Sequence, residues 1–123
     1  MRFLGIDYGR RKVGLAMSDG RLAEPYQVIR YKDYDKMVLH INRIIEKQKI
    51  EKIVVGVSEG EMGEESKKFA EFFKAETWDE TLSSHDAIEM SIASHMGRKK
   101  RREMEDAFAA SIMLQNYIDQ SNG

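Results

Sequence analysis

The residues best suited to chemistry in this chain are carboxylates that end predicted strands or open a predicted helix. Asp7 ends a short apolar run, Asp79-Glu80 ends another, and Asp106 lies at the start of the last predicted helix. Other acids at similar boundaries are Glu59, Glu61, Glu103 and Glu105. Carboxylates that meet repel one another unless a proton, a basic partner or a bound cation offsets their charge. Hard divalent cations prefer such oxygen ligands, so the pattern predicts a site for Mg²⁺ or Mn²⁺.

A two-ion site of this kind would perform phosphodiester hydrolysis. Two metal ions about 4 Å apart can activate a water and stabilise the leaving oxygen without a separate general base. The competing explanation is chance, because 21 acids in 123 residues will place some at strand ends, and acids also favour helix N-termini. That explanation is strongest for Glu59, Glu61, Glu103 and Glu105, and weakest for Asp7, which directly follows a core strand.

The elements that must position these acids follow from the hydrophobic pattern. Strands are predicted at 2–6, 12–17, 27–31, 52–57 and 76–78, with the first two joined in a hairpin. Helices are predicted from a cap at Asp33 or Asp35 to 48, then at 64–74, 83–95 and from 103 to 117 or beyond, with a basic link at 96–102. Right-handed crossovers make strands one, four and five parallel, so their carboxyl ends share one edge of the sheet. Function collects at that edge in open α/β sheets.

Two sets of apolar side chains are expected to face the core. Phe69, Phe72 and Phe73 are predicted to pack inward from their helix, and the last helix is predicted to present Met104, Phe108, Ile112 and Ile118.

Composition limits the possible classes. The chain has 123 residues, which is the size of one domain, and we expect residues 1–123 to form one. Charged residues make up 33%, yet the net charge is −1, so a uniformly basic nucleic-acid binder is excluded and any such surface is a local patch. The absence of cysteine excludes disulfides and thiolate zinc sites. With no apolar run of about 18 residues and no leader-like N-terminus, a cytoplasmic protein without membrane contact is expected.

The motifs at these positions resemble a known family. GIDYGRRKVGLAMSD, IEKIVVGV, WDETLSS and GRKKRREMEDAFAASIMLQNYID are similar, nearly end to end, to the YqgF family of Holliday-junction-resolvase-like proteins, also called pre-16S rRNA nucleases. The resemblance implies an RNase H-like fold: a five-stranded mixed sheet, three antiparallel strands and then two parallel, flanked by helices. It implies catalytic acids at Asp7, Glu80 and Asp106, and metal ligands at Asp7, Asp79, Glu80 and Asp106.

The chain departs from the family pattern in two places. The segment after Gly56, VSEGEMGEES, is shorter and more acidic than the usual proline-containing loop, and Thr81 stands where an arginine is common. These departures leave open a non-catalytic nucleic-acid-binding or ribosome-associated module with the same fold.

Cationic residues close to the acids are the predicted nucleic-acid contacts. The candidates are Arg98, Lys99, Lys100, Arg101 and Arg102, with Arg10, Arg11 and Lys12 of the first hairpin as weaker ones. Lysine and arginine contacts to phosphates supply most non-specific affinity for nucleic acid. A solvated link or a charged turn is the simpler alternative for each group.

A second rival is phosphotransfer. Asp7-Tyr8-Gly9 with Gly14 matches the D-x-G-x-x-x-x-G pattern of actin-like ATPases and sugar kinases, which bind nucleotide between two domains. This chain has room for one domain, so the favoured prediction is a metal-dependent endonuclease acting on pre-16S rRNA or branched DNA. We expect no small-molecule cofactor and a monomer or weak dimer.

Overall fold

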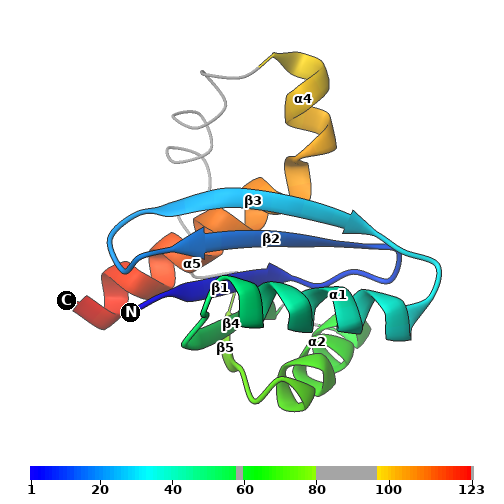
Figure 1. The fold of residues 1–123 in the computed structure, drawn as a ribbon, viewed down its shortest axis with the longest axis horizontal. Coiled ribbons are helices and arrows are strands. Elements are labelled where there is room, and N and C mark those ends of the chain that lie inside the picture. The colour runs from blue at the N-terminus through cyan, green and yellow to red at the C-terminus, as the bar shows by residue number, and fades with distance from the viewer. Residues whose placement is uncertain (58–59, 80–96, 123) are drawn as a thin grey trace.

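The central element is a five-stranded mixed sheet. The structure is a computed structural model that describes residues 1–57, 60–79 and 97–122. Its strands are β1 (Phe3–Asp7), β2 (Lys12–Ser18), β3 (Ala23–Arg30), β4 (Lys52–Val57) and β5 (Glu76–Asp79). They lie in the order β3-β2-β1-β4-β5, with β1, β2 and β3 antiparallel and with β4 parallel to both β1 and β5 (Figure 1). The predicted sheet is confirmed.

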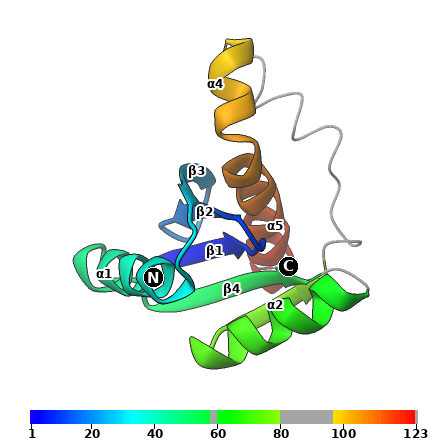
Figure 2. The ribbon, with the colours of Figure 1, turned by 90° about the vertical axis from the view of Figure 1, so that its right-hand side faces the viewer.

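Helices cover both faces of the sheet. The helices are α1 (Tyr34–Lys47), α2 (Glu61–Phe72), α4 (Arg98–Glu103) and α5 (Glu105–Asn122). Helices α1 and α2 pack on one face through Met37, Ile41 and Phe69, and α5 packs on the other through Met113 and Leu114. Figure 2 shows the three layers, with α4 extending away from the sheet beyond the start of α5.

Local chemistry fixes the start of α1. The Asp33 carboxylate accepts hydrogen bonds from the backbone N–H groups of Asp35 and Lys36, at 3.0 and 3.3 Å. A side-chain oxygen before the first turn satisfies amides that lack helical partners. Of the two predicted caps, Asp33 is therefore the one used.

Several predicted boundaries were wrong. Strand β3 begins at Ala23 because a register shift opposite Leu15 and Ala16 lets the chain pair with β2 on both sides of Tyr26. Helix α2 begins at Glu61. The predicted helix at 83–95 lies outside the described residues.

Two predicted core positions also differ. Phe72 is 61% exposed and packs edge-on against Phe73, while Phe69 takes the core position of this helix. Met104 is half-buried in the turn between α4 and α5, because α5 does not begin until Glu105.

The basic run is helical. Arg98–Glu103 forms α4, where a link was predicted. Arginine and lysine are good helix formers, and their charge does not prevent a short helix that is open to solvent. Within the described residues, no helix is both long and apolar enough to cross a membrane.

Candidate functional site

A pocket at the carboxyl end of β1 brings together acids from the two ends of the chain. This hollow of about 280 Å³ is here called the Asp7 pocket; it is lined by Asp7, Tyr8, Gly9, Arg10, Arg11, Lys12 and Asp106. The predicted acids Asp7 and Asp106 therefore share one pocket, as do Arg10 and Arg11. Its composition, two carboxylates among cations, suits binding of phosphates and hard metal ions.

Gly14 allows this convergence. It is the β2 partner of Asp7, and a Cβ at this position would overlap the carbonyl of Asp106 and the backbone nitrogen of Ala107. The first turn of α5 therefore lies directly on β2. Because alternate strand residues share a face, Asp7 lies on the same side as Gly5, which contacts Leu114 of α5.

Asp106 forms an ion pair inside the pocket. The Nζ of Lys12 lies 3.0 Å from Oδ2 of Asp106, and the two side chains are 39% and 26% exposed. Lys12 opens β2, so the first hairpin supplies both Asp7 and a cation for Asp106. Sequence analysis named Lys12 only as a weaker nucleic-acid candidate of the first hairpin. It did not predict the pairing with Asp106, because only the fold brings residues 12 and 106 together.

Arg10 is held by α2. Its Nε donates to the Glu65 carboxylate at 2.9 Å, and a terminal nitrogen forms an ion pair with the same carboxylate at 2.8 Å. Glu61 lies further away, at 3.8 Å. The hydrogen bond to Glu65 raises the pKa of Arg10, and the charge of Glu65 adds to this. Arg10 was predicted to contact nucleic acid; here it ties the hairpin turn to α2.

Tyr31 holds the same hairpin turn through two hydrogen bonds. Its backbone N–H donates to the Arg11 carbonyl at 2.9 Å, and its hydroxyl donates to the Gly9 carbonyl. Burial raises the pKa of Tyr31, as does its hydrogen bond with Tyr8. The Tyr8 ring in turn stacks on Phe69 with ring centroids 4.5 Å apart. These contacts hold the turn beside Asp7 at several points. Sequence analysis did not predict this structural role for Tyr31 and Tyr8.

The acids of β5 lie further along the edge. Asp79 pairs with Val57, and β4 separates β5 from β1. Trp78 packs edge-on against Tyr117 of α5, so strand alternation puts Asp79 on the opposite face. Glu59 and Glu80 lie outside the described residues. Over 1–57, 60–79 and 97–122, no three His, Cys, Asp or Glu residues form a group that could hold a metal.

Comparison with known sequences decides the family. A family profile described as "RuvX: Holliday junction resolvase" matches residues 1–120. The chain belongs to the RuvX family. The predicted family and the nuclease class are thereby confirmed.

Relatives of this RuvX-family chain are similar over nearly their whole length. A protein of Halothermothrix orenii (strain H 168) is 35% identical, with 99% of this chain and 97% of that protein covered. One of Desulforamulus reducens is also 35% identical, with 97% of each covered. Both are named "Putative pre-16S rRNA nuclease".

Solved structures confirm the fold class. The structure titled "T. thermophilus RuvC in complex with Holliday junction substrate" superposes with a TM-score of 0.61 at 15% identity, covering 100% of this chain and 96% of that one. A second Thermus thermophilus RuvC structure gives 0.55 at 13%, covering 100% and 97%. At such identities the likeness establishes the RNase H-like fold.

The basic helix α4 leads directly into the acids of this RuvX-family chain. It ends at Glu103, and Asp106 follows within the first turn of α5. Lys99 and Arg102 are exposed, and α4 extends beyond the sheet on the side of the α5 start (Figure 2). Helix α4 thus carries exposed cations on the segment that directly precedes Asp106.

Proposed function

We propose that this RuvX-family nuclease is a metal-dependent endonuclease whose reaction takes place at the Asp7 pocket. The observation that carries the proposal is that Asp7 and Asp106 line one pocket, together with Arg11 and Lys12. Such a set of oxygen donors suits Mg²⁺ or Mn²⁺. The ammonium group already paired with Asp106 indicates that this carboxylate favours a cation beside it.

Each residue has a defined part. Asp7 and Asp106 would hold divalent ions, and such ions would supply water activation and stabilisation of the leaving oxygen. Glu80 is the proposed third carboxylate, since it follows β5 directly; Asp79 is the alternative, although strand alternation puts it on the face opposite Trp78.

The cations orient the substrate. Arg11 lines the pocket, and Lys99 and Arg102 are exposed on α4. We assign these residues, with the other cations of Arg98–Glu103, to phosphates that flank the scissile bond. Ionic contacts of this kind position a nucleic acid without reading its sequence. Arg10 joins them only if the substrate competes with Glu65.

We propose precursor 16S rRNA as the substrate, acted on in the cytoplasm. The names of the full-length relatives support RNA, whereas the RuvC likeness establishes only the fold. The alternative remains a branched DNA substrate.

The test offers both substrates to the same protein. An RNA that carries the precursor ends of 16S rRNA and a four-way DNA junction are incubated with the chain in Mg²⁺, in Mn²⁺ and in EDTA. We expect cleavage of the RNA, its loss in EDTA, and its loss in Asp106→Asn with binding retained. Preferential cutting of the junction would show that branched DNA, and not precursor rRNA, is the substrate. Binding of RNA without cutting of either substrate would favour the non-catalytic module.

A further inference from the structure

The ion pair between Lys12 and Asp106 lies inside the proposed metal-binding pocket. Both residues line the Asp7 pocket, and Lys12 approaches Asp106 with its Nζ 3.0 Å from Oδ2. An exposed surface pair contributes little to stability, about 0–1 kcal/mol. A pair between partly buried groups beside a second carboxylate has a different consequence, because it governs which other cations can approach.

The fold makes Lys12 the cation for this carboxylate. Arg10 is bound to Glu65 on α2, so its guanidinium is committed elsewhere. Lys12 lies two residues before Gly14 on β2, and alternate strand residues share a face, so it lies on the side where α5 begins. Two carboxylates that converge on one pocket repel one another, and a nearby ammonium group lowers that cost.

We propose that Lys12 is a built-in counter-cation for Asp106 and that a divalent metal ion displaces it. This inference rests on the proposed metal site. Without metal, the ammonium group offsets the negative charge of the pocket. When metal binds, the same ammonium group opposes it, because a unit charge repels a divalent ion at close range. Lys12 is thus a positioning residue that weakens metal affinity and keeps the metal-free pocket intact.

The decisive variant removes the charge and keeps the length of the side chain. Lys12→Met should bind Mn²⁺ about tenfold more tightly than the wild type, since loss of a nearby unit charge removes a repulsion of that order. Lys12→Arg keeps the charge and should bind Mn²⁺ like the wild type. Lys47→Met, at the last turn of α1, changes the net charge equally and should leave Mn²⁺ affinity unchanged. Mn²⁺ binding is measured on nucleic-acid-free protein by calorimetry and by the electron paramagnetic resonance signal of free Mn²⁺.

Stability supplies a second readout. Metal-free Lys12→Met should melt at a lower temperature than the wild type, and Mn²⁺ should raise its melting temperature by a larger amount. A residue with only a structural role would lower the melting temperature without tightening Mn²⁺ binding. In cleavage assays the Mg²⁺ concentration that gives half of full activity should fall in Lys12→Met.

The outcomes separate this inference from the proposed function. If the wild type binds Mn²⁺, Asp106→Asn weakens that binding and Lys12→Met leaves it unchanged or weaker, the metal site stands and the role of Lys12 is overturned. If the wild type shows no Mn²⁺ binding under any condition, both proposals are overturned. Tightening by Lys47→Met as large as that by Lys12→Met would also overturn the inference, because net charge alone would then explain it.

Discussion

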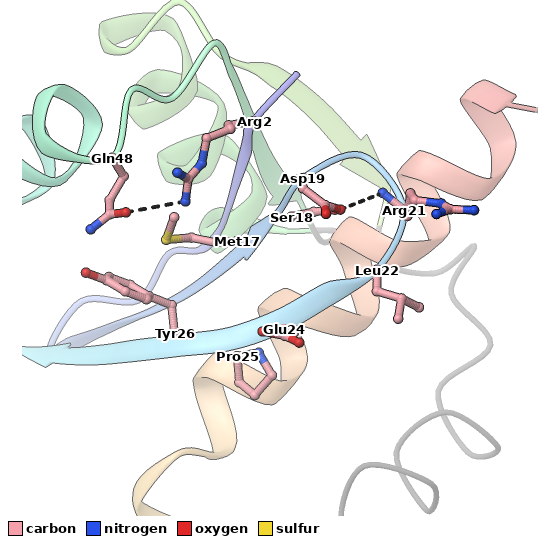
Figure 3. Close-up of a pocket in the computed structure, with 10 residues that line it drawn as sticks. All are labelled: Arg2, Met17, Ser18, Asp19, Arg21, Leu22, Glu24, Pro25, Tyr26 and Gln48. Atoms are coloured by element: carbon pink, nitrogen blue, oxygen red, sulfur yellow. Dashed lines mark hydrogen bonds between the residues drawn. The ribbon is translucent and has the colours of Figure 1, made fainter.

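The two ends of the sheet carry hollows that differ in size and in chemistry. The larger, here called the Arg2 groove, has a volume of about 800 Å³ (Figure 3). The Arg2 groove lies at the end opposite Asp7, since Arg2 precedes β1 and Asp7 ends it. It is lined by Arg2, Met17, Ser18, Asp19, Arg21, Leu22, Glu24, Pro25, Tyr26 and Gln48. The Asp7 pocket has about a third of that volume, 280 Å³.

The side chains in the two hollows are engaged differently. In the Arg2 groove, Arg2 donates to the Gln48 amide oxygen at 3.3 Å, and Asp19 accepts from the backbone of Arg21 at 3.2 Å. Figure 3 shows these as two separate hydrogen bonds, of which only the second joins near neighbours in the sequence. In the Asp7 pocket, two acids from distant segments meet beside cations. The comparison favours the smaller Asp7 pocket as the proposed site, because there two acids from opposite ends of the chain converge and one of them is paired with a lysine.

Removing one carboxylate from each hollow tests most directly whether the Asp7 pocket and the Arg2 groove differ in function. Asp7→Asn should lower the cleavage rate at least about a thousandfold, because ion-assisted stabilisation of the transition state is worth several kcal/mol. Asp19→Asn, in the Arg2 groove, should leave the rate within about twofold, since an exposed surface carboxylate contributes little. Single-turnover cleavage measures both. Equal losses in the two variants would remove the distinction between the hollows.

The second-largest effect should come from Gly14. Gly14→Ala places a Cβ where the Asp106 carbonyl lies, so α5 must shift. A shift of about 1 Å at a reacting group can cost on the order of a hundredfold in rate, and overpacking costs about 1–3 kcal/mol of stability. Cleavage and urea unfolding measure the two losses. Gly97→Ala is the matched control, because no described atom lies within 4 Å of its added Cβ; an unchanged rate in Gly14→Ala would show that the α5 contact does not position Asp106.

The sequence was sufficient to predict the strands and the edge of the sheet at which Asp7 lies. The β-branched run of β4 predicted Lys52–Val57, and the structure has these bounds. Short strands and right-handed crossovers then leave few topologies, so the convergence of Asp7 with Asp106 could be expected.

The details of the site were not predictable in this way. The Lys12–Asp106, Arg10–Glu65 and Tyr31–Gly9 contacts join residues that are far apart in the sequence. Such contacts depend on the angle at which helices cross the sheet, and no local pattern encodes that angle. The helical state of Arg98–Glu103 escaped prediction because a charged run lacks the apolar spacing by which helices are recognised.

A smaller effect should distinguish the cations of α4 from those of the Arg2 groove. The double substitution Lys99→Ala with Arg102→Ala removes two exposed charges from the helix that precedes Asp106. RNA affinity should fall about tenfold, and the slope of log affinity against log salt should become shallower by about one per lost phosphate contact. Arg2→Ala with Arg21→Ala is the matched control of equal charge and should change affinity much less. Titrations at several salt concentrations measure both; equal effects would mean that net charge, and not the place of α4, governs binding.

The smallest expected effect comes from removing the Tyr31 hydroxyl, which holds the turn beside Asp7. Tyr31→Phe removes the hydroxyl that donates to the Gly9 carbonyl and keeps the ring in place. Loss of one such hydrogen bond costs about 1 kcal/mol, and the Tyr31 backbone bond to Arg11 remains to hold the turn. Cleavage should therefore slow a few-fold, with binding of RNA unchanged, because the change displaces the turn next to Asp7 but leaves the cations of α4 untouched. Tyr26→Phe, in the Arg2 groove, is the matched loss of a hydroxyl and should alter neither. If Tyr31→Phe weakened RNA binding instead, the turn would act as a substrate contact, and the Asp7 pocket would extend across the hairpin to β3.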